Sequence, residues 1–379
     1  LVPVDGFDER GNGRHGRFLD GVLWGRPCPN IPFASLEDYE TLATGVELVV
    51  QHLLADQTYN SIGNFIRFYD EFKRSTFTNL KTFFNSFIPA LCSSEQTCVG
   101  LGLELLTCLK QKFPHLRRGV RLVSCEESVD DLCNYIRRPP EEVEDTEKEH
   151  VLVAVGITIG KTYRKGVLLL DPGYHVARAV TVMNDCKYPH TGWFTQTDEK
   201  FVKREYCYTF ANKSKPDYVI WEVKETRGEK INLTSSLIYV GAPFLSPVTI
   251  TEKRNLVYDY RSWLARSTKG EILAGVHFPV ANLTSTVSNN EVLNGCTATL
   301  IYTDKRGTKQ RRKLRFEHIY NNDLRDNECE MIEDCGRQLG LTKSNSLLEI
   351  LLRISCILSD RQFITQVLEI NKSINIIGE

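Results

Sequence analysis

The spacing of hydrophobic residues changes along this chain from a helical period to a strand period and back again. Between residues 35 and 91, apolar residues recur every three or four positions, which predicts two or three helices. Residues 98–113 carry one apolar face and predict a further helix that ends at Pro114. Short apolar runs separated by turn residues predict strands between residues 150 and 318. Residues 346–370 return to the helical period.

This order of elements predicts an α+β fold rather than an alternating parallel sheet. We expect an N-terminal helical bundle, a central antiparallel β-barrel or sheet region, and a C-terminal helical or α/β lid. The expected units are an extended N-terminal arm at 1–34, a helical domain at 35–125, an acidic loop insertion at 126–149, a β domain at 150–318 and a C-terminal helical lid at 319–379.

Composition narrows the class of protein. The 379 residues are 41% hydrophobic and 25% charged, as in a globular protein, and the longest apolar runs are too short to span a membrane. We therefore expect a cytoplasmic protein with no membrane contact. The formal net charge of -1 argues against nucleic acid as a partner. A basic run at 305–313 predicts a solvated hairpin tip, and a patch for a polyanionic ligand is the alternative.

The 12 cysteines are scattered without a Cys-x-x-Cys motif, so we expect no metal site and interpret most of them as reduced core residues. Four matches to the glycosylation acceptor pattern keep secretion open as a less favoured possibility. They begin at Asn212, Asn232, Asn282 and Asn371.

Three of the predicted elements carry residues that together suit nucleophilic catalysis. Cys98 opens a helix, His150 opens an apolar strand, and Asp171 ends the next apolar strand. A free thiol has a pKa of about 8.5 and becomes a nucleophile when a helix N-terminus and an imidazolium stabilise its anion. Because the two strands are expected to pair, the aspartate can hold the histidine in place. The alternative interpretation is a core cysteine, a capping histidine and a turn aspartate.

This layout resembles that of papain-like and transglutaminase-like proteins, and within that group it resembles the arylamine N-acetyltransferases. Residues 98–106 (CVGLGLELL) are similar to the nucleophile helix of that family. Residues 150–155 (HVLVAV) and 168–174 (LLLDPGY) are similar to its histidine strand and its aspartate segment, and residues 261–273 to its later hairpin. The helical C-terminus is similar to its closing lid.

The resemblance implies a cysteine-dependent acyltransferase that uses acetyl-CoA. An acyl group would move from the thioester to Cys98 and then to a small-molecule amine or hydroxyl acceptor, with His150 as base and Asp171 orienting it. Gln96, Thr97, Gly173, Tyr174 and His175 flank the cysteine and the aspartate, so we expect them to bind substrate or cofactor. Glu104 is expected to face away from the thiol.

The motif also differs from the family pattern. Residues 94–97 (SEQT) and 172–175 (PGYH) stand where the family has glycines that shape its coenzyme A cleft. A cysteine hydrolase or amidase that acts on a peptide or protein amide with the same triad is therefore an alternative. A non-catalytic binding or scaffold protein is another, and the N-terminal arm could then contact a protein partner.

Overall fold

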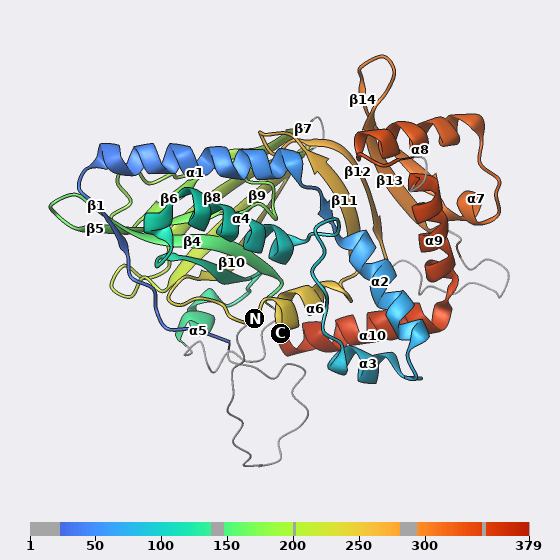
Figure 1. The fold of residues 1–379 in the computed structure, drawn as a ribbon, viewed down its shortest axis with the longest axis horizontal. Coiled ribbons are helices and arrows are strands. Elements are labelled where there is room, and N and C mark those ends of the chain that lie inside the picture. Colours follow the sequence, from blue (N-terminus) through green and yellow to red (C-terminus); the bar gives the residue numbers. More distant parts are fainter. Residues whose placement is uncertain are drawn as a thin grey trace, which may run out of the picture.

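The computed structural model describes residues 23–137, 148–199, 202–280, 293, 295–342 and 346–378. These residues form two sheets with helices packed against them, so the predicted α+β class is confirmed (Figure 1). The strands predicted between residues 150 and 318 are divided between the two sheets. Residues 1–22 of the predicted N-terminal arm and residues 138–147 of the predicted acidic loop lie outside the described residues.

Within the described residues, the larger sheet has nine strands. They are β1 (Ile31–Phe33), β3 (Val120–Glu126), β4 (His150–Ile159), β5 (Arg164–Leu170), β6 (Val180–Met183), β7 (Phe194–Glu199), β8 (Val202–Phe210), β9 (Tyr218–Arg227) and β10 (Lys230–Tyr239). The order is β6-β5-β4-β3-β10-β9-β8-β7, and all these pairs are antiparallel; β1 joins β4 in parallel. The sheet curls strongly, so that β6 also contacts β8 (Figure 1).

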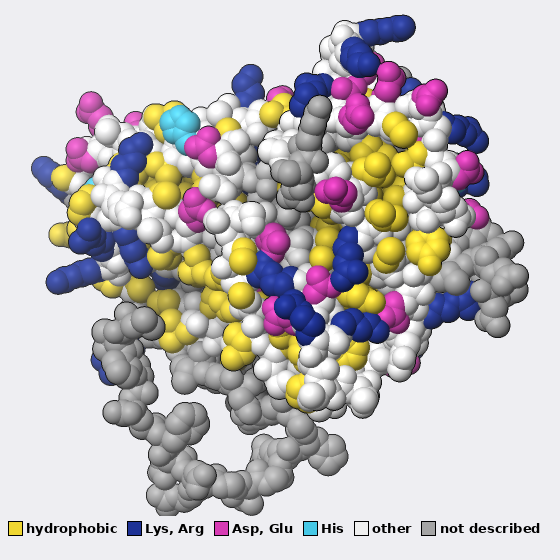
Figure 2. All heavy atoms as spheres, turned by 45° about the vertical axis from the view of Figure 1, so that its right-hand side comes forward, with side chains coloured by type: hydrophobic (Ala, Val, Ile, Leu, Met, Phe, Trp, Pro, Cys, Tyr) yellow, Lys and Arg dark blue, Asp and Glu magenta, His cyan; other side chains and the backbone are white. Residues whose placement is uncertain are grey.

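The smaller sheet has five strands in the described part of the chain, in the order β14-β13-β12-β11-β2. They are β2 (Tyr59–Asn60), β11 (Tyr260–Arg266), β12 (Ile272–Pro279), β13 (Thr297–Thr303) and β14 (Lys309–Arg315). The β13–β14 connection is the basic hairpin that the sequence predicts. Lys and Arg side chains stand at its tip, at the top of Figure 2.

The helices predicted at 35–91, 98–113 and 346–370 are present, whereas α5 and α6 lie in ranges predicted as a loop and as a β domain. They are α1 (Leu36–Asp56), α2 (Ser61–Arg74), α3 (Leu80–Ser86), α4 (Cys98–Lys112), α5 (Leu132–Arg137), α6 (Lys253–Asn255), α7 (Phe316–Tyr320), α8 (Asp326–Gln338), α9 (Leu347–Ser359) and α10 (Arg361–Gly378). A π-helical turn at Val248–Glu252 precedes α6. The predicted helix at 346–370 is two helices, because the chain leaves the helical conformation at Asp360, whose carboxylate then accepts from the Phe363 N–H.

Separate hydrophobic cores lie against the two sheets. α2, α3 and α7–α10 pack with the smaller sheet, and Phe363, Leu351 and Val276 are fully or almost fully buried there. α1 and α4 pack on the larger sheet around residues such as Leu168. Gly102 lets α4 approach this sheet, because a Cβ there would lie 3.0 Å from the Leu122 Cδ2 atom.

Two expectations about cysteines and glycosylation are corrected. All 12 cysteines are free, but five are buried, at positions 98, 125, 207, 296 and 335. Of the other seven, Cys108 is partly buried against the core of the larger sheet, and Cys133, Cys186 and Cys356 are exposed. Asn371 cannot accept a glycan in this fold, because its side chain is buried and accepts a 2.7 Å hydrogen bond from Arg254. Asn212 and Asn232 are exposed, and Asn282 lies outside the described residues. No helix among the described residues is both long and apolar enough to cross a bilayer.

Candidate active site

Cys98 is the first residue of α4. The preceding Thr97 caps the helix, since its hydroxyl accepts from the Val99 N–H. The first N–H groups of a helix have no acceptor within the helix and carry the positive end of its dipole. The Cys98 thiol therefore sits where an anion is stabilised. Its residue is only 4% exposed, so α4 presents a nearly enclosed sulfur atom.

His150 and Asp171 meet at one edge of the larger sheet. His150 begins β4, Asp171 follows the end of β5, and the two strands pair antiparallel with Val153 opposite Leu170. The His150 Nε2 atom lies 3.0 Å from both carboxylate oxygens of Asp171. Both side chains are buried, so each is the partner that the other needs away from water.

Asp171 contacts the Nε2 atom of His150, which leaves the Nδ1 atom able to accept the proton of the Cys98 thiol. Burial disfavours a charged ring, yet the Asp171 carboxylate, its hydrogen bond and the Cys98 thiol raise the pKa of His150 well above its usual value. Gly173 packs closely against both residues, where a side chain would collide with them. A Cβ at this position would lie 2.7 Å from the His150 Cε1 atom and 2.8 Å from the Cys98 Cβ. The structure thus brings Cys98, His150, Asp171 and Gly173 together.

Tyr174 packs against the imidazole ring of His150. Its ring meets the His150 ring edge to face, with centroids 4.7 Å apart. The Tyr174 hydroxyl donates a 2.6 Å hydrogen bond to Glu127, and the Tyr174 N–H donates to Asp171. Burial raises the pKa of Glu127, although His150 and Tyr174 oppose that rise. The Glu127 carboxyl group is therefore separated from His150 by the ring of Tyr174.

The His175 ring meets the Tyr59 ring edge to face, with the ring centroids 6.3 Å apart. Its backbone has a positive φ of 61°, and the Arg266 guanidinium donates both to the His175 Nδ1 atom and to the Pro172 carbonyl. Burial, Arg266 and Arg204 lower the pKa of His175 well below its usual value, so its ring is neutral. Arg266 itself is buried in β11. The smaller sheet thereby holds the loop that follows Asp171.

Gln96 and Thr97 contact neighbouring protein groups, although the Gln96 Oε1 atom is buried without a hydrogen-bond partner. The Gln96 amide donates to Glu104, and its carbons pack against Gly100. The Thr97 hydroxyl donates to Glu252. The Glu104 carboxylate thus holds the segment that precedes the thiol. Structural contacts of this kind do not require a ligand.

Sequence reasoning missed a set of polar residues in the segment that crosses the N-terminus of α4. Glu252, at the end of the π-helical turn, is buried and accepts from both Thr97 and Asn64. Burial raises the pKa of Glu252 to about 7, opposed by the Thr97 hydrogen bond and Arg67. Asn255 donates its side-chain N–H toward the Cys98 sulfur at 3.7 Å. No periodic pattern marks these residues, and the only signal in the sequence is the polar run 251–255 (TEKRN) between apolar residues.

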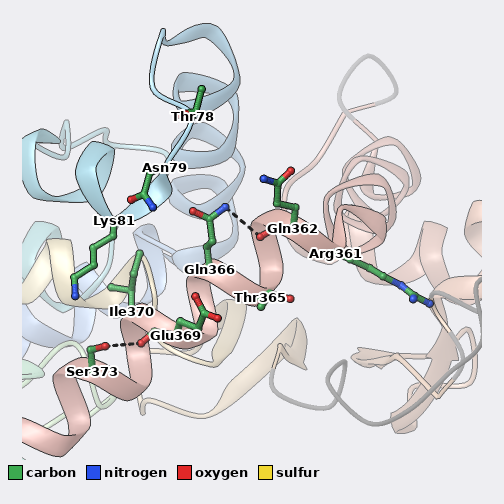
Figure 3. A pocket seen from close by; sticks show the side chains of 10 residues that line it. All are labelled: Thr78, Asn79, Lys81, Arg361, Gln362, Thr365, Gln366, Glu369, Ile370 and Ser373. Carbon is green, nitrogen blue, oxygen red and sulfur yellow. Dashed lines mark hydrogen bonds between the residues drawn. The ribbon is translucent and has the colours of Figure 1, made fainter.

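Other features of the described residues do not add to this site. No group of three or more His, Cys, Asp or Glu side chains in the described ranges could hold a metal ion. An open hollow of about 770 Å³ lies between α3 and α10, lined largely by polar side chains such as Asn79, Gln366 and Glu369 (Figure 3). None of the candidate site residues lines it.

Comparisons with known proteins give no family. No protein-family model, no curated protein and no solved structure matches this chain.

Proposed function

We propose that this chain is a cysteine-dependent acyltransferase of the cytoplasm, with a fold similar to that of the arylamine N-acetyltransferases. One observation carries the proposal: the buried His150 ring lies between the Asp171 carboxylate and the Cys98 thiol, which opens α4. A nucleophilic cysteine needs these partners. The proposed donor is acetyl-CoA, and the proposed acceptor is a small amine or alcohol.

The chemistry proceeds in two steps. His150 takes the thiol proton, and the Cys98 sulfur forms a bond to the carbonyl carbon of the donor while the carbonyl electron pair moves onto oxygen. The pair then returns and the bond to the donor thiolate breaks, with the proton passing from His150 to that thiolate. In the second step the acceptor attacks the acyl-cysteine, His150 takes its proton, and the Cys98 thiolate leaves. Asp171 steadies the imidazolium each time.

The charges around the site favour one direction of approach for a phosphate-bearing donor. The positive charges of Arg204 and Arg266 act on His175, whereas burial favours the neutral form of Glu127 beside Tyr174. A polyphosphate is attracted by the two arginine side chains. We therefore propose that the donor phosphates lie on the His175 side, with Gly173, Tyr174 and His175 bordering the reacting group.

Mass spectrometry after exposure to acetyl-CoA tests the proposal. We expect one acetyl group on Cys98, and release of that group when an arylamine or an alcohol is added. The Cys98→Ala variant should take up none, and Cys207→Ala, which changes a buried cysteine in another strand, should behave as the wild type. Absence of any acyl-enzyme from acetyl-CoA and from p-nitrophenyl acetate would refute the proposal. Loss of the acyl group to water alone would instead identify a hydrolase.

A further inference from the structure

The side chain of Asn255 is directed at the sulfur of Cys98. Its Nδ2 atom lies 3.7 Å from the Sγ atom, within the range of an N–H···S hydrogen bond. Asn255 ends α6, which is separated from Cys98 by more than 150 residues of sequence. It is half-buried, so its amide faces the thiol at the wall of the site rather than in bulk water.

The backbone that carries Asn255 is fixed by buried charged groups. The Arg261 guanidinium, which is fully buried, donates to the carbonyl oxygens of Asn255 and Leu256 at 3.2 and 2.6 Å. Glu252, three residues before Asn255, binds Thr97 and so connects the segment to the start of α4. Burying such charges is expensive unless they are paired. The segment is therefore held in one position relative to the sulfur atom.

We propose that Asn255 is a catalytic residue whose side-chain amide, together with the backbone N–H of Cys98, stabilises the oxyanion formed during acyl transfer. This inference rests on the proposed function. When the sulfur bonds to the carbonyl carbon, the electron pair of the C=O bond moves to oxygen, and that oxygen lies about one bond length farther from the sulfur than the carbon does. A hydrogen-bond donor that lies beside the sulfur before the reaction is therefore close to the oxyanion when it forms. Hydrogen-bond donors that are already in place lower the activation barrier of acyl transfer.

Other roles for Asn255 agree less well with these contacts. Orientation of the imidazole is already provided by Asp171, which takes the Nε2 atom of His150. Stabilisation of the segment is provided by Arg261 and Glu252 through groups other than the Asn255 amide. The amide itself is directed at the atom that becomes acylated.

Two reactions of the same sulfur atom separate these roles. Acylation by p-nitrophenyl acetate passes through an oxyanion, whereas alkylation by iodoacetamide displaces iodide at a saturated carbon and forms none. In Asn255→Ala we expect the acylation rate to fall by about 10²–10³-fold, the usual effect of removing one oxyanion donor, while alkylation changes by less than about threefold. Asn255→Leu keeps the side-chain volume and removes the hydrogen-bond donor, so it should show the same two rates as Asn255→Ala. It replaces the alanine variant in the experiment if that variant folds poorly.

The matched control is Asn184→Ala, because Asn184 lies in the turn after β6, is half-buried as Asn255 is, and donates to the Lys213 carbonyl. It should leave both rates unchanged. Equal losses of acylation and alkylation in the Asn255 variants would assign Asn255 a structural role, and unchanged acylation would assign it none; either result overturns the inference. Failure of the proposed function itself looks different, because the wild-type protein would then be alkylated by iodoacetamide but not acylated at all.

Discussion

At the residue scale, the pair of His150 and Asp171 sets the charge of the site. The ring is buried, and burial alone would keep it neutral. The adjacent carboxylate reverses that preference and raises the pKa of His150 well above its usual value. The ring is therefore expected to be protonated in the resting site, where it can stabilise negative charge that develops beside it during a reaction.

Asp171→Asn tests this expectation, because it keeps the shape of the side chain and removes its charge. We expect the pKa of His150 to fall and acylation of Cys98 to slow by about 10²–10⁴-fold. The His150 Cε1–H signal, titrated by NMR, and the burst of p-nitrophenol report the two effects. Asp185→Asn, which breaks an exposed pair with Arg164, is the control. An unchanged His150 titration would contradict the assignment.

The same pair has a consequence for stability. Because the pKa of His150 is raised in the folded state, proton binding stabilises the fold below the unfolded value of 6.5. That contribution is lost as the pH rises through the folded pKa of His150. The Asp171→Asn variant should lack this part of the pH dependence.

At the scale of elements, the segment from the π-helical turn through α6 determines how α4 meets the smaller sheet. Its Glu252 side chain is buried against Thr97, the cap of α4, and burial raises the pKa of Glu252 to about 7. An acid whose pKa is raised on folding holds its proton more tightly in the folded state. The free energy of unfolding therefore falls as the pH rises from 4.5 through 7.

Glu252→Gln should abolish this decrease in the free energy of unfolding with rising pH. The amide keeps a hydrogen-bonding group for Thr97 and Asn64 and cannot ionise. From the shift between 4.5 and about 7, we expect the variant to gain on the order of 3 kcal/mol over the wild type at pH 8 and little at pH 4. Urea unfolding at both pH values measures the difference. Glu271→Gln, at an exposed hairpin turn, should show no such dependence. A parallel pH profile in Glu252→Gln and the wild type would contradict the prediction.

Local pattern explains which elements could be predicted. The Ser35 and Ser346 caps and the start of α4 at Cys98 follow from short signals that the structure confirms. The strands β4 and β5 are continuous apolar runs, and their antiparallel pairing places His150 near Asp171. β10 was not predicted, because Ile231 and Leu233 are exposed and polar residues occupy its centre.

The remaining part of the site depends on tertiary contacts that no local signal encodes. Asn255, Glu252 and Arg266 come from the region after the larger sheet and reach Cys98 or the Asp171 loop only once the sheets pack together. Their hydrogen bonds span more than 90 residues of sequence. The roles expected for Gln96 and Thr97 as ligand-binding residues stay predictions, because their observed contacts are with the protein itself.

At the scale of the whole molecule, the candidate site combines residues from elements associated with both sheets. Cys98, His150 and Asp171 belong to elements of the larger sheet, whereas Asn255 and Arg266 lie close to or within the smaller sheet. Regions with separate cores often open with different free energies. The two parts of this protein should then respond separately to core mutations.

A matched pair of substitutions tests this expectation. Leu351→Ala removes a fully buried side chain from the core of the smaller sheet, and Leu168→Ala does so for the larger sheet. Each should destabilise its own region by about 2–5 kcal/mol. Hydrogen exchange should accelerate in β11–β14 and α9 for the first variant, and in β3–β5 for the second. The same exchange pattern in both variants would indicate a single cooperative unit.

The Asn255–Cys98 contact also bears on how the proposed activity would arise during synthesis. A ribosome-bound intermediate that had completed only the first curled sheet would hold the sulfur beside its imidazole, but the amide from α6 would not yet have arrived. Such an intermediate could react with simple electrophiles and would transfer acyl groups poorly. Turnover would therefore begin only when the second half of the polypeptide has docked, which makes catalysis a direct reporter of complete assembly.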